Sequence, residues 1–183
     1  MDDLTEKTIH TEVIYNGKII TLQVDDVTLP NGKTAKREIV KHPGAVAIIP
    51  VTEEQKIVFV EQYRKPLERS LLEIPAGKIE QGENPEVTAI RELEEEIGYT
   101  TNSLTYVDAF YTSPGFADEF MHIYLTTDLQ YLEEDVPGDD DEFINRVELT
   151  LAEAVEMVKN QRISDAKTNY AILYLQASGQ LKC

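Results

Sequence analysis

The sequence predicts an α/β protein, with one mixed α/β domain over residues 43–183 and an antiparallel β extension over residues 1–42 before it. Three observations predict this class. Alternating apolar and polar residues in the first third of the chain are typical of strands. A period of nearly four residues after Pro75 is typical of a helix, and strand patterns then return before two final helical segments. A length of 183 residues suits one domain with a short extension.

The extension begins with strand segments over residues 12–29, interrupted at Asn16-Gly17, a dipeptide that favours a tight hairpin turn. A second turn is expected at residues 30–32. Further strands are predicted, in order, over residues 36–42, 45–51 and 56–63. The continuous apolar run over residues 45–51 predicts a strand that is buried on both faces.

A helix is predicted over residues 85–97. Asn84 can cap its first turn, Pro85 fits the first helical position, and Gly98 can end it. Strands are then expected over residues 103–110 and 119–126, followed by a polar, acidic loop over residues 133–142.

Two helices are predicted at the end of the chain. Thr150 and Glu153 form a capping box at the start of the first helix, and Ser164 or Asp165 can cap the second, which is expected to run to about residue 176. The order of strands, helix, strands and helices is that of a mixed α/β domain.

The charge of the chain restricts its partners. Seventeen Lys and Arg residues stand against 34 Asp and Glu residues, which gives a formal net charge of −17. Such a field repels nucleic acids and anionic membranes, so binding to either is not expected. A phosphate ester could bind only where a few arginines or carboxylate-bound divalent cations cancel that charge locally.

The cysteine content and the first residues indicate the compartment. The one cysteine, Cys183, allows no intrachain disulfide and no cysteine zinc site. The first ten residues lack the basic and apolar regions of an export signal, and no stretch approaches the roughly 20 apolar residues that span a bilayer. We therefore expect a cytoplasmic protein.

The helix over residues 85–97 carries the most informative charges. Its 100° turn per residue places Glu92, Glu95 and Glu96 on one face, opposite an apolar face of Ile90, Leu93 and Ile97. Three carboxylates on one face repel each other unless a cation is bound, and oxygen ligands of this kind suit Mg²⁺ or Mn²⁺. A solvated acidic face is the alternative interpretation.

The spacing around this helix distinguishes the two interpretations. From Gly77 the chain continues with five residues and Glu83, seven residues and Arg91-Glu92-Leu93, then one residue, Glu95-Glu96, one residue and Gly98-Tyr99. This pattern resembles the Nudix box at every defining position except the last, where Tyr99 replaces the usual aliphatic residue.

The resemblance implies a Nudix hydrolase, with the Nudix fold of an α/β/α sandwich around a mixed sheet and cleavage of a nucleoside diphosphate linked to another group. Carried over by position, it makes Glu92 and Glu96 the principal metal ligands, Glu95 a ligand or a partner of the attacking water, and the Ala76 carbonyl a further ligand. The remaining box positions would be structural, with Gly77 permitting a tight turn and Arg91 orienting a box carboxylate. These structural residues are Gly77, Glu83, Arg91 and Gly98.

Features outside the box resemble the ADP-ribose pyrophosphatase branch of the family. Pro114 lies 15 residues after Tyr99, in a loop whose Gly115 and Phe116 would contact substrate. Arg37 and Arg64 resemble the arginines that meet the phosphates and the terminal ribose. The alternative for each arginine is an ion pair with Glu38 or Glu61 at the surface. The branch is typically homodimeric through its N-terminal strands.

The acidic loop offers the general base. In this branch the base, or a last metal contact, comes from a loop between the final strands, where Glu142 stands here with Asp140 as the second choice. A solvated turn is the alternative, in which case Glu95 is the next candidate for the base.

The expected reaction is metal-dependent hydrolysis of ADP-ribose to AMP and ribose 5-phosphate. Other nucleoside diphosphate sugars, dinucleotides and oxidised nucleotides are alternatives, and a non-catalytic ADP-ribose sensor or a calcium-binding module is less well supported, because the chain has neither a basic reader module nor an EF-hand loop. His10, His42 and His122 are weak ligand candidates. Tyr15, Tyr63 and Phe116 are candidates for stacking on adenine.

Overall fold

The computed structural model describes residues 3–134, 136–138 and 143–181. The chain divides into two compact units. The first contains the residues up to Gly44 together with Phe110–Met121, and the second contains Ala45–Ala109 and the residues from His122 onward.

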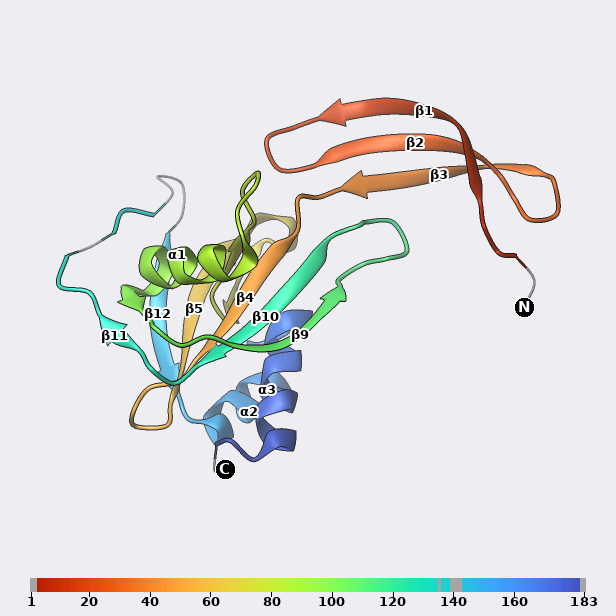
Figure 1. Ribbon diagram of the computed structural model, residues 1–183. Helices are drawn as coiled ribbons and strands as arrows, with labels where there is room; N and C mark the ends of the chain where they lie inside the picture. The colour runs from red at the N-terminus through yellow and green to blue at the C-terminus, as the bar shows by residue number, and fades with distance from the viewer. Residues whose placement is uncertain (1–2, 135, 139–142, 182–183) are drawn as a thin grey trace. The chain divides into compact units, whose positions relative to one another are not determined.

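The first unit is built on a three-stranded antiparallel sheet, drawn in red and orange in Figure 1. Its strands, in spatial and sequence order, are β1 (Lys7–Asn16), β2 (Thr21–Thr28) and β3 (Thr34–Lys41). Strand β1 starts five residues earlier than predicted. The first connection spans residues 17–20, because Asn16 pairs with Thr21 and Gly17 N donates to Ile20 O at 2.9 Å, so it is longer than the tight turn predicted at Asn16-Gly17.

The second unit contains the remaining strands. One sheet has the order β7-β4-β10-β9, a second has the order β12-β5-β6, and β11 pairs with β8. All six residues of β4 are buried, which confirms the prediction of a strand buried on both faces. The bounds are β4 (Ala45–Pro50), β5 (Ile57–Arg64), β6 (Arg69–Glu73), β7 (Ala76–Lys78), β8 (Tyr99–Thr100), β9 (Thr105–Tyr111), β10 (Phe120–Thr126), β11 (Gln130–Tyr131) and β12 (Ile144–Leu149).

Five of these strands were not predicted, namely β6, β7, β8, β11 and β12. Each is short or lacks a strong alternating pattern, and each exists because it pairs with another segment. Strands β6 and β12 are antiparallel partners of β5, and β7 is an antiparallel partner of β4. A three-residue 3₁₀ helix, Lys65–Leu67, connects β5 to β6.

The helices agree closely with the sequence. Helix α1 (Pro85–Ile97) has the predicted bounds, the Asn84 side chain accepts from Glu86 N, and Gly98 ends the helix with a φ of 70°. Helix α2 (Leu151–Lys159) begins with the predicted capping box, and helix α3 (Ala166–Ser178) is capped by Asp165 rather than Ser164. No helix among the described residues is long and apolar enough to cross a membrane.

Helix α1 packs against the strands through two of the three apolar residues predicted for this face, Leu93 and Ile97, while Ala89 takes the place of Ile90. Its core residues are Ala89, Leu93 and Ile97, spaced four apart, whereas Ile90 is only half-buried. These side chains join a cluster that includes Val46, Ile48, Val58 and Val60 of β4 and β5. Figure 1 shows α1 on one side of these strands and α2 and α3 on the other, which is the α/β/α arrangement expected.

Candidate functional site

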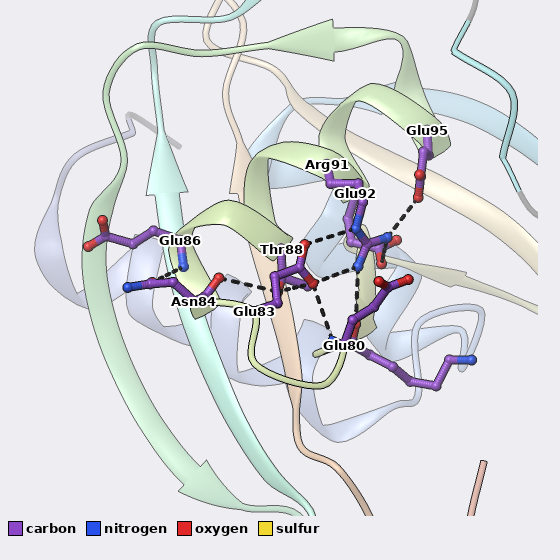
Figure 2. A network of polar contacts seen from close by, with 9 residues as sticks. Glu80, Glu83, Asn84, Glu86, Thr88, Arg91, Glu92 and Glu95 are labelled. Carbon is purple, nitrogen blue, oxygen red and sulfur yellow. Dashed lines mark hydrogen bonds and ion pairs between the residues drawn. The ribbon is translucent and has the colours of Figure 1, made fainter. Parts of the chain in front are cut away.

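Arg91 of α1 organises the charges of the motif (Figure 2). Its Nη1 donates to Glu92 Oε1 and to Glu95 Oε2, each at 2.8 Å. Its Nε and Nη2 donate to the two Glu83 oxygens, each at 3.2 Å, and Nη2 also donates to the Lys78 carbonyl at 3.2 Å. One guanidinium therefore holds three carboxylates of the motif, as its planar fork of five donors allows.

These contacts keep the pair of Glu83 and Arg91 charged. The hydrogen bond from Arg91 lowers the pKa of Glu83, against the opposing effect of burial, and the Thr88 hydroxyl also donates to this carboxylate at 2.7 Å. Burial lowers the pKa of Arg91, but the hydrogen bond to Glu83 and the charge of Glu92 outweigh that effect and raise it. The guanidinium is a permanent cation at the centre of the cluster.

Gly77 lies directly against the Glu92 carboxylate. A Cβ atom on Gly77 would come within 1.8 Å of Glu92 Oε1, and Glu92 is only 7% exposed. Gly77 was expected to permit a tight turn, but it lies in strand β7, paired with Val46 of β4, and its φ is not left-handed. Glycine is needed here because of this close approach and not because of backbone conformation.

Glu96 contacts the residue before Gly77. The Ala76 N–H donates to Glu96 Oε2 at 3.0 Å, so two carboxylates from successive turns of α1 meet the Ala76–Gly77 backbone. No three acidic, histidine or cysteine side chains in the described part of the chain are arranged to hold a metal ion, and Glu95 is turned towards Arg91. The carboxylate oxygens of Glu92 and Glu96 beside the Ala76–Gly77 backbone nevertheless belong to the ligand class that suits a hard divalent cation.

Arg64 ends β5 and contacts Glu73, a glutamate that was not among the predicted site residues. Its Nε and Nη2 donate to Glu73 Oε1 and Oε2 at 2.7 and 2.9 Å. Glu73 is 2% exposed and also accepts from Lys167. Burial raises the pKa of Glu73, but the hydrogen bonds and charges of Arg64 and Lys167 outweigh that effect and lower it to about 2. A charged residue inside the apolar run Leu71–Ile74 was the available signal.

Neither arginine makes the ion pair that was weighed as its alternative. Arg37 of β3 pairs with Glu6, through Nε to Oε2 at 2.8 Å and Nη2 to Oε1 at 2.5 Å, rather than with Glu38. Arg64 pairs with Glu73, while Glu61 accepts from Arg162 at 2.5 Å. Glu6 lies 31 residues from Arg37 and Glu73 lies nine residues from Arg64, so the acid adjacent in sequence was the wrong choice for both arginines.

Pro114, Gly115 and Phe116 belong to the same unit as Arg37. The Phe116 carbonyl accepts from Val40 N at 2.8 Å, which fixes this loop to the end of β3, and the Phe116 ring is exposed. The Thr112 hydroxyl donates to Glu119, so the two ends of the loop are also joined.

The general-base candidates Asp140 and Glu142 lie outside the described residues. The described residues that lead towards them lie beside the end of α1. The Leu132 N–H donates to Gly98 O at 3.0 Å, and a Cβ on Gly138 would be 3.7 Å from Glu95 O.

Tyr99, the one departure from the box pattern, is half-buried against the core cluster. Its ring meets Tyr131 edge to face with centroids 5.7 Å apart, and the Arg146 guanidinium lies 5.3 Å from its centroid. Arg146 also donates to Ile97 O at 3.2 Å, where a cation is favourable at the end of a helix. The tyrosine therefore packs behind the end of the helix, between the core cluster, Tyr131 and Arg146.

The weak candidates are dispersed over several elements. His10 and Tyr15 are exposed in β1, His122 is half-buried in β10, and the Tyr63 hydroxyl donates to Glu68 Oε2 at 2.8 Å. His42 Nδ1 accepts a hydrogen bond from Gly44 N at 3.1 Å, so this nitrogen is engaged by the backbone.

Comparisons with known proteins identify both parts of the chain. Residues 41–170 match the model of the NUDIX domain, and residues 6–40 match that of the nucleoside diphosphate sugar hydrolase N-terminal domain. The chain is 58% identical over 182 residues to the ADP-ribose pyrophosphatase of Bacillus subtilis (strain 168), covering 100% of this chain and 98% of that protein.

Two further proteins match along almost the whole chain. The methanol dehydrogenase activator of Bacillus methanolicus is 58% identical over 177 residues, covering 97% of this chain and 96% of that protein. A crystal structure of an ADP compounds hydrolase superposes with a TM-score of 0.85 at 23% identity, covering 99% of this chain and 100% of that one, which supports the fold. With its box residues gathered around Arg91 and its match to the domain model over residues 41–170, the chain belongs to the Nudix family.

Proposed function

We propose that this chain is a metal-dependent pyrophosphatase that hydrolyses ADP-ribose to AMP and ribose 5-phosphate. The observation that carries the proposal is the meeting of the Glu92 and Glu96 carboxylates at the Ala76–Gly77 backbone, at a point where any larger residue than glycine would clash. The 58% identity to an ADP-ribose pyrophosphatase supports the choice of substrate.

The box residues would hold the cation. Glu92, Glu96 and the Ala76 carbonyl are the proposed ligands, and Glu95 joins them if its side chain leaves Arg91. A bound Mg²⁺ or Mn²⁺ supplies neutralising charge at the diphosphate and a water of lowered pKa. Arg91 keeps the carboxylates oriented and offsets their mutual repulsion when they are brought together.

The other predicted residues would bind substrate and move the proton. Arg64 offers its guanidinium to the phosphates. Arg37, Pro114, Gly115 and Phe116 of the first unit keep their predicted role as substrate-binding residues. Glu142, or Asp140 in its place, takes the proton from the attacking water. Support comes from Gly138, which lies beside the backbone of Glu95 and brings the approach to this loop near the box helix.

The first unit, which we call the N-terminal unit, is proposed to join two copies of the chain in a homodimer. All ten residues of β1 are exposed, and Ile9, Val13 and Tyr15 are each more than half exposed. Apolar side chains along an exposed strand favour a partner surface, and a second copy of the chain is the simplest partner. Sedimentation equilibrium tests this, because Val13→Glu should shift the protein towards the monomer. We also place the protein in the cytoplasm, in line with its single cysteine.

The test of the reaction is AMP release from ADP-ribose with Mg²⁺, beside ADP-mannose, GDP-mannose, NADH, FAD and dNTPs. Glu92→Gln and Glu96→Gln should each lower kcat by about a hundredfold or more, because each removes one charge from the ligand set. Glu94→Gln, on the same helix, is the matched control and should stay within about twofold of wild type. Near-normal turnover in both box variants at saturating Mg²⁺ would contradict the proposal.

A second candidate function rests on the other relative at 58% identity, which is named a methanol dehydrogenase activator. By that similarity, the chain would act on a methanol dehydrogenase. The rate of alcohol oxidation by such an enzyme, with and without this protein and with its Glu96→Gln variant, tests the idea. Stimulation that needs Glu96 would join the two functions through one site.

A further inference from the structure

Glu73 is a buried carboxylate that the box chemistry does not use. It is 2% exposed, yet it is charged and satisfied on both oxygens, by Arg64 Nε and Nη2 on one side and by Lys167 Nζ on the other. Lys167 also donates to Asp165 Oδ2 at 3.0 Å. Two cations and two carboxylates therefore form a charge-compensated row, in which removing Glu73 takes away the ion-pair partner of Arg64.

Only two of the three nitrogens of the Arg64 guanidinium donate to Glu73. Its side chain is 39% exposed, and its Nε and Nη2 are directed at Glu73. Among the described residues, none accepts a hydrogen bond from its Nη1. A guanidinium held on one edge and open on the other can present a fixed pair of N–H groups to a phosphate oxygen.

The five-residue segment Glu73–Gly77 connects this arginine to the box. At one end Glu73 holds Arg64, and at the other Ala76 N donates to Glu96 Oε2 at 3.0 Å. Between them Pro75 O accepts from Ile48 N of β4 at 2.9 Å, which fixes the segment to the core sheet. The position of Arg64 relative to Glu96 is therefore set by a short, anchored piece of backbone.

The first turn of α3 fastens the same segment from another direction. Ile74 N donates to the buried Thr168 hydroxyl at 2.9 Å, and the adjacent Lys167 reaches Glu73. Asp165 caps this helix by accepting from Thr168 N. The start of α3 therefore contacts the segment that holds Arg64 at two neighbouring residues, Glu73 and Ile74.

We propose that Glu73 is a positioning residue that holds the Arg64 guanidinium for a substrate phosphate, and that Lys167 supports Glu73 in this role. The inference rests on the proposed function, in which Arg64 binds the diphosphate. A positioning role and simple charge neutralisation predict opposite changes in substrate binding when Glu73 is removed. A carboxylate that only neutralised Arg64 would compete with phosphate, so its removal would tighten substrate binding, whereas loss of a positioning residue weakens it.

The experiment is a double-mutant cycle in which kcat and KM are measured at saturating Mg²⁺. The substrate is ADP-ribose, or whichever diphosphate compound of the panel wild type hydrolyses. Glu73→Gln keeps the shape but cannot hold both Arg64 donors, so we expect KM to rise about tenfold with kcat within about threefold. Lys167→Met should raise KM about threefold, and Lys167→Arg should restore it. In an Arg64→Ala background neither change should add more than about twofold.

The control is Lys159→Met, which removes a lysine paired with Glu156 on the exposed face of α2 and should leave both constants unchanged. The Mg²⁺ concentration for half-maximal rate should match wild type in every variant. An unchanged or lower KM in Glu73→Gln would overturn the inference, as would an equal rise of KM in the Arg64→Ala background or an unaltered KM in Arg64→Ala itself. If Glu73→Gln fails to fold, the Lys167 variants decide by the same criteria. If wild type hydrolyses the substrate no faster than Glu96→Gln does, the proposed function itself is contradicted, and this outcome is distinct from a failure of the positioning role.

Discussion

The two units contain the same contact in two different environments. Arg64 and Glu73 form a bidentate pair at 2.7 and 2.9 Å, and Arg37 and Glu6 form one at 2.8 and 2.5 Å. Glu73 is 2% exposed, whereas the Glu6 side chain is 34% exposed. Equal geometry therefore does not give equal importance, because burial decides what it costs to lose one partner.

The strands and glycines of the two units differ in the same way. Every residue of β4 is buried and every residue of β1 is exposed. A Cβ on Gly77 would meet the buried Glu92 carboxylate, whereas a Cβ on Gly17 would meet the exposed Tyr15 ring at 2.5 Å. Glu92 is 7% exposed and Tyr15 is 59% exposed, so only the tyrosine can move aside without disturbing other side chains.

The largest expected effect is on stability. Glu73→Ala removes the bidentate partner of Arg64 and leaves Lys167 with Asp165 alone, and it should lower the free energy of unfolding by about 3 to 5 kcal/mol. Glu6→Ala removes the matched surface pair and should leave the unfolding midpoint close to that of wild type. Urea denaturation of both variants makes the comparison, and equal losses would show that burial does not separate the two pairs.

The pH dependence of stability sharpens the same contrast. The pKa of Glu73 lies at about 2 in the fold against an ordinary value of 4.5, so its stabilisation is fully present above pH 4.5 and is lost as pH falls towards 2. The shift corresponds to about 3 kcal/mol. Denaturation at several pH values should show this loss in wild type and not in Glu73→Gln, while Glu6→Gln should follow the wild-type curve.

The two glycines test how closely the second unit is packed around the box. Gly77→Ala should lower kcat by about a hundredfold, because the new methyl group displaces a proposed metal ligand while the fold survives. Gly17→Ala should leave kcat within about twofold, since the Tyr15 side chain can rotate away. Circular dichroism of both variants confirms folding, and normal turnover in Gly77→Ala would remove Glu92 from the proposed ligand set.

The smallest expected effects concern substrate binding by the two arginines. Arg64→Ala should raise KM about ten- to a hundredfold, the loss of a charge-assisted contact worth about 1.5 to 3 kcal/mol. Arg37→Ala should raise it less, because water and Glu6 compete for this guanidinium. Initial rates over a range of ADP-ribose concentrations separate the two, and an unchanged KM in both would return them to structural ion pairs.

Features set by local chemistry could be predicted from the sequence. Asn84, Pro85 and Gly98 defined α1 at both ends, and the spacing of the box identified its carboxylates and the family. Features set by distant pairing could not. Strand β7 exists through β4, and the partner of Glu73, Lys167, lies 94 residues away. The roles of the substrate and base residues stay predictions.

The anchored segment Glu73–Gly77 also restricts how the gene can change. The connections at residues 17–20 and 29–33 lie at the surface, where added or removed residues lengthen a loop without moving a strand. Between Glu73 and Gly77 a single inserted residue would shift either the carboxylate that holds Arg64 or the amide that meets Glu96. Length variation is therefore expected in the turns of the N-terminal sheet and not in this segment, although both are loops or short strands of similar size.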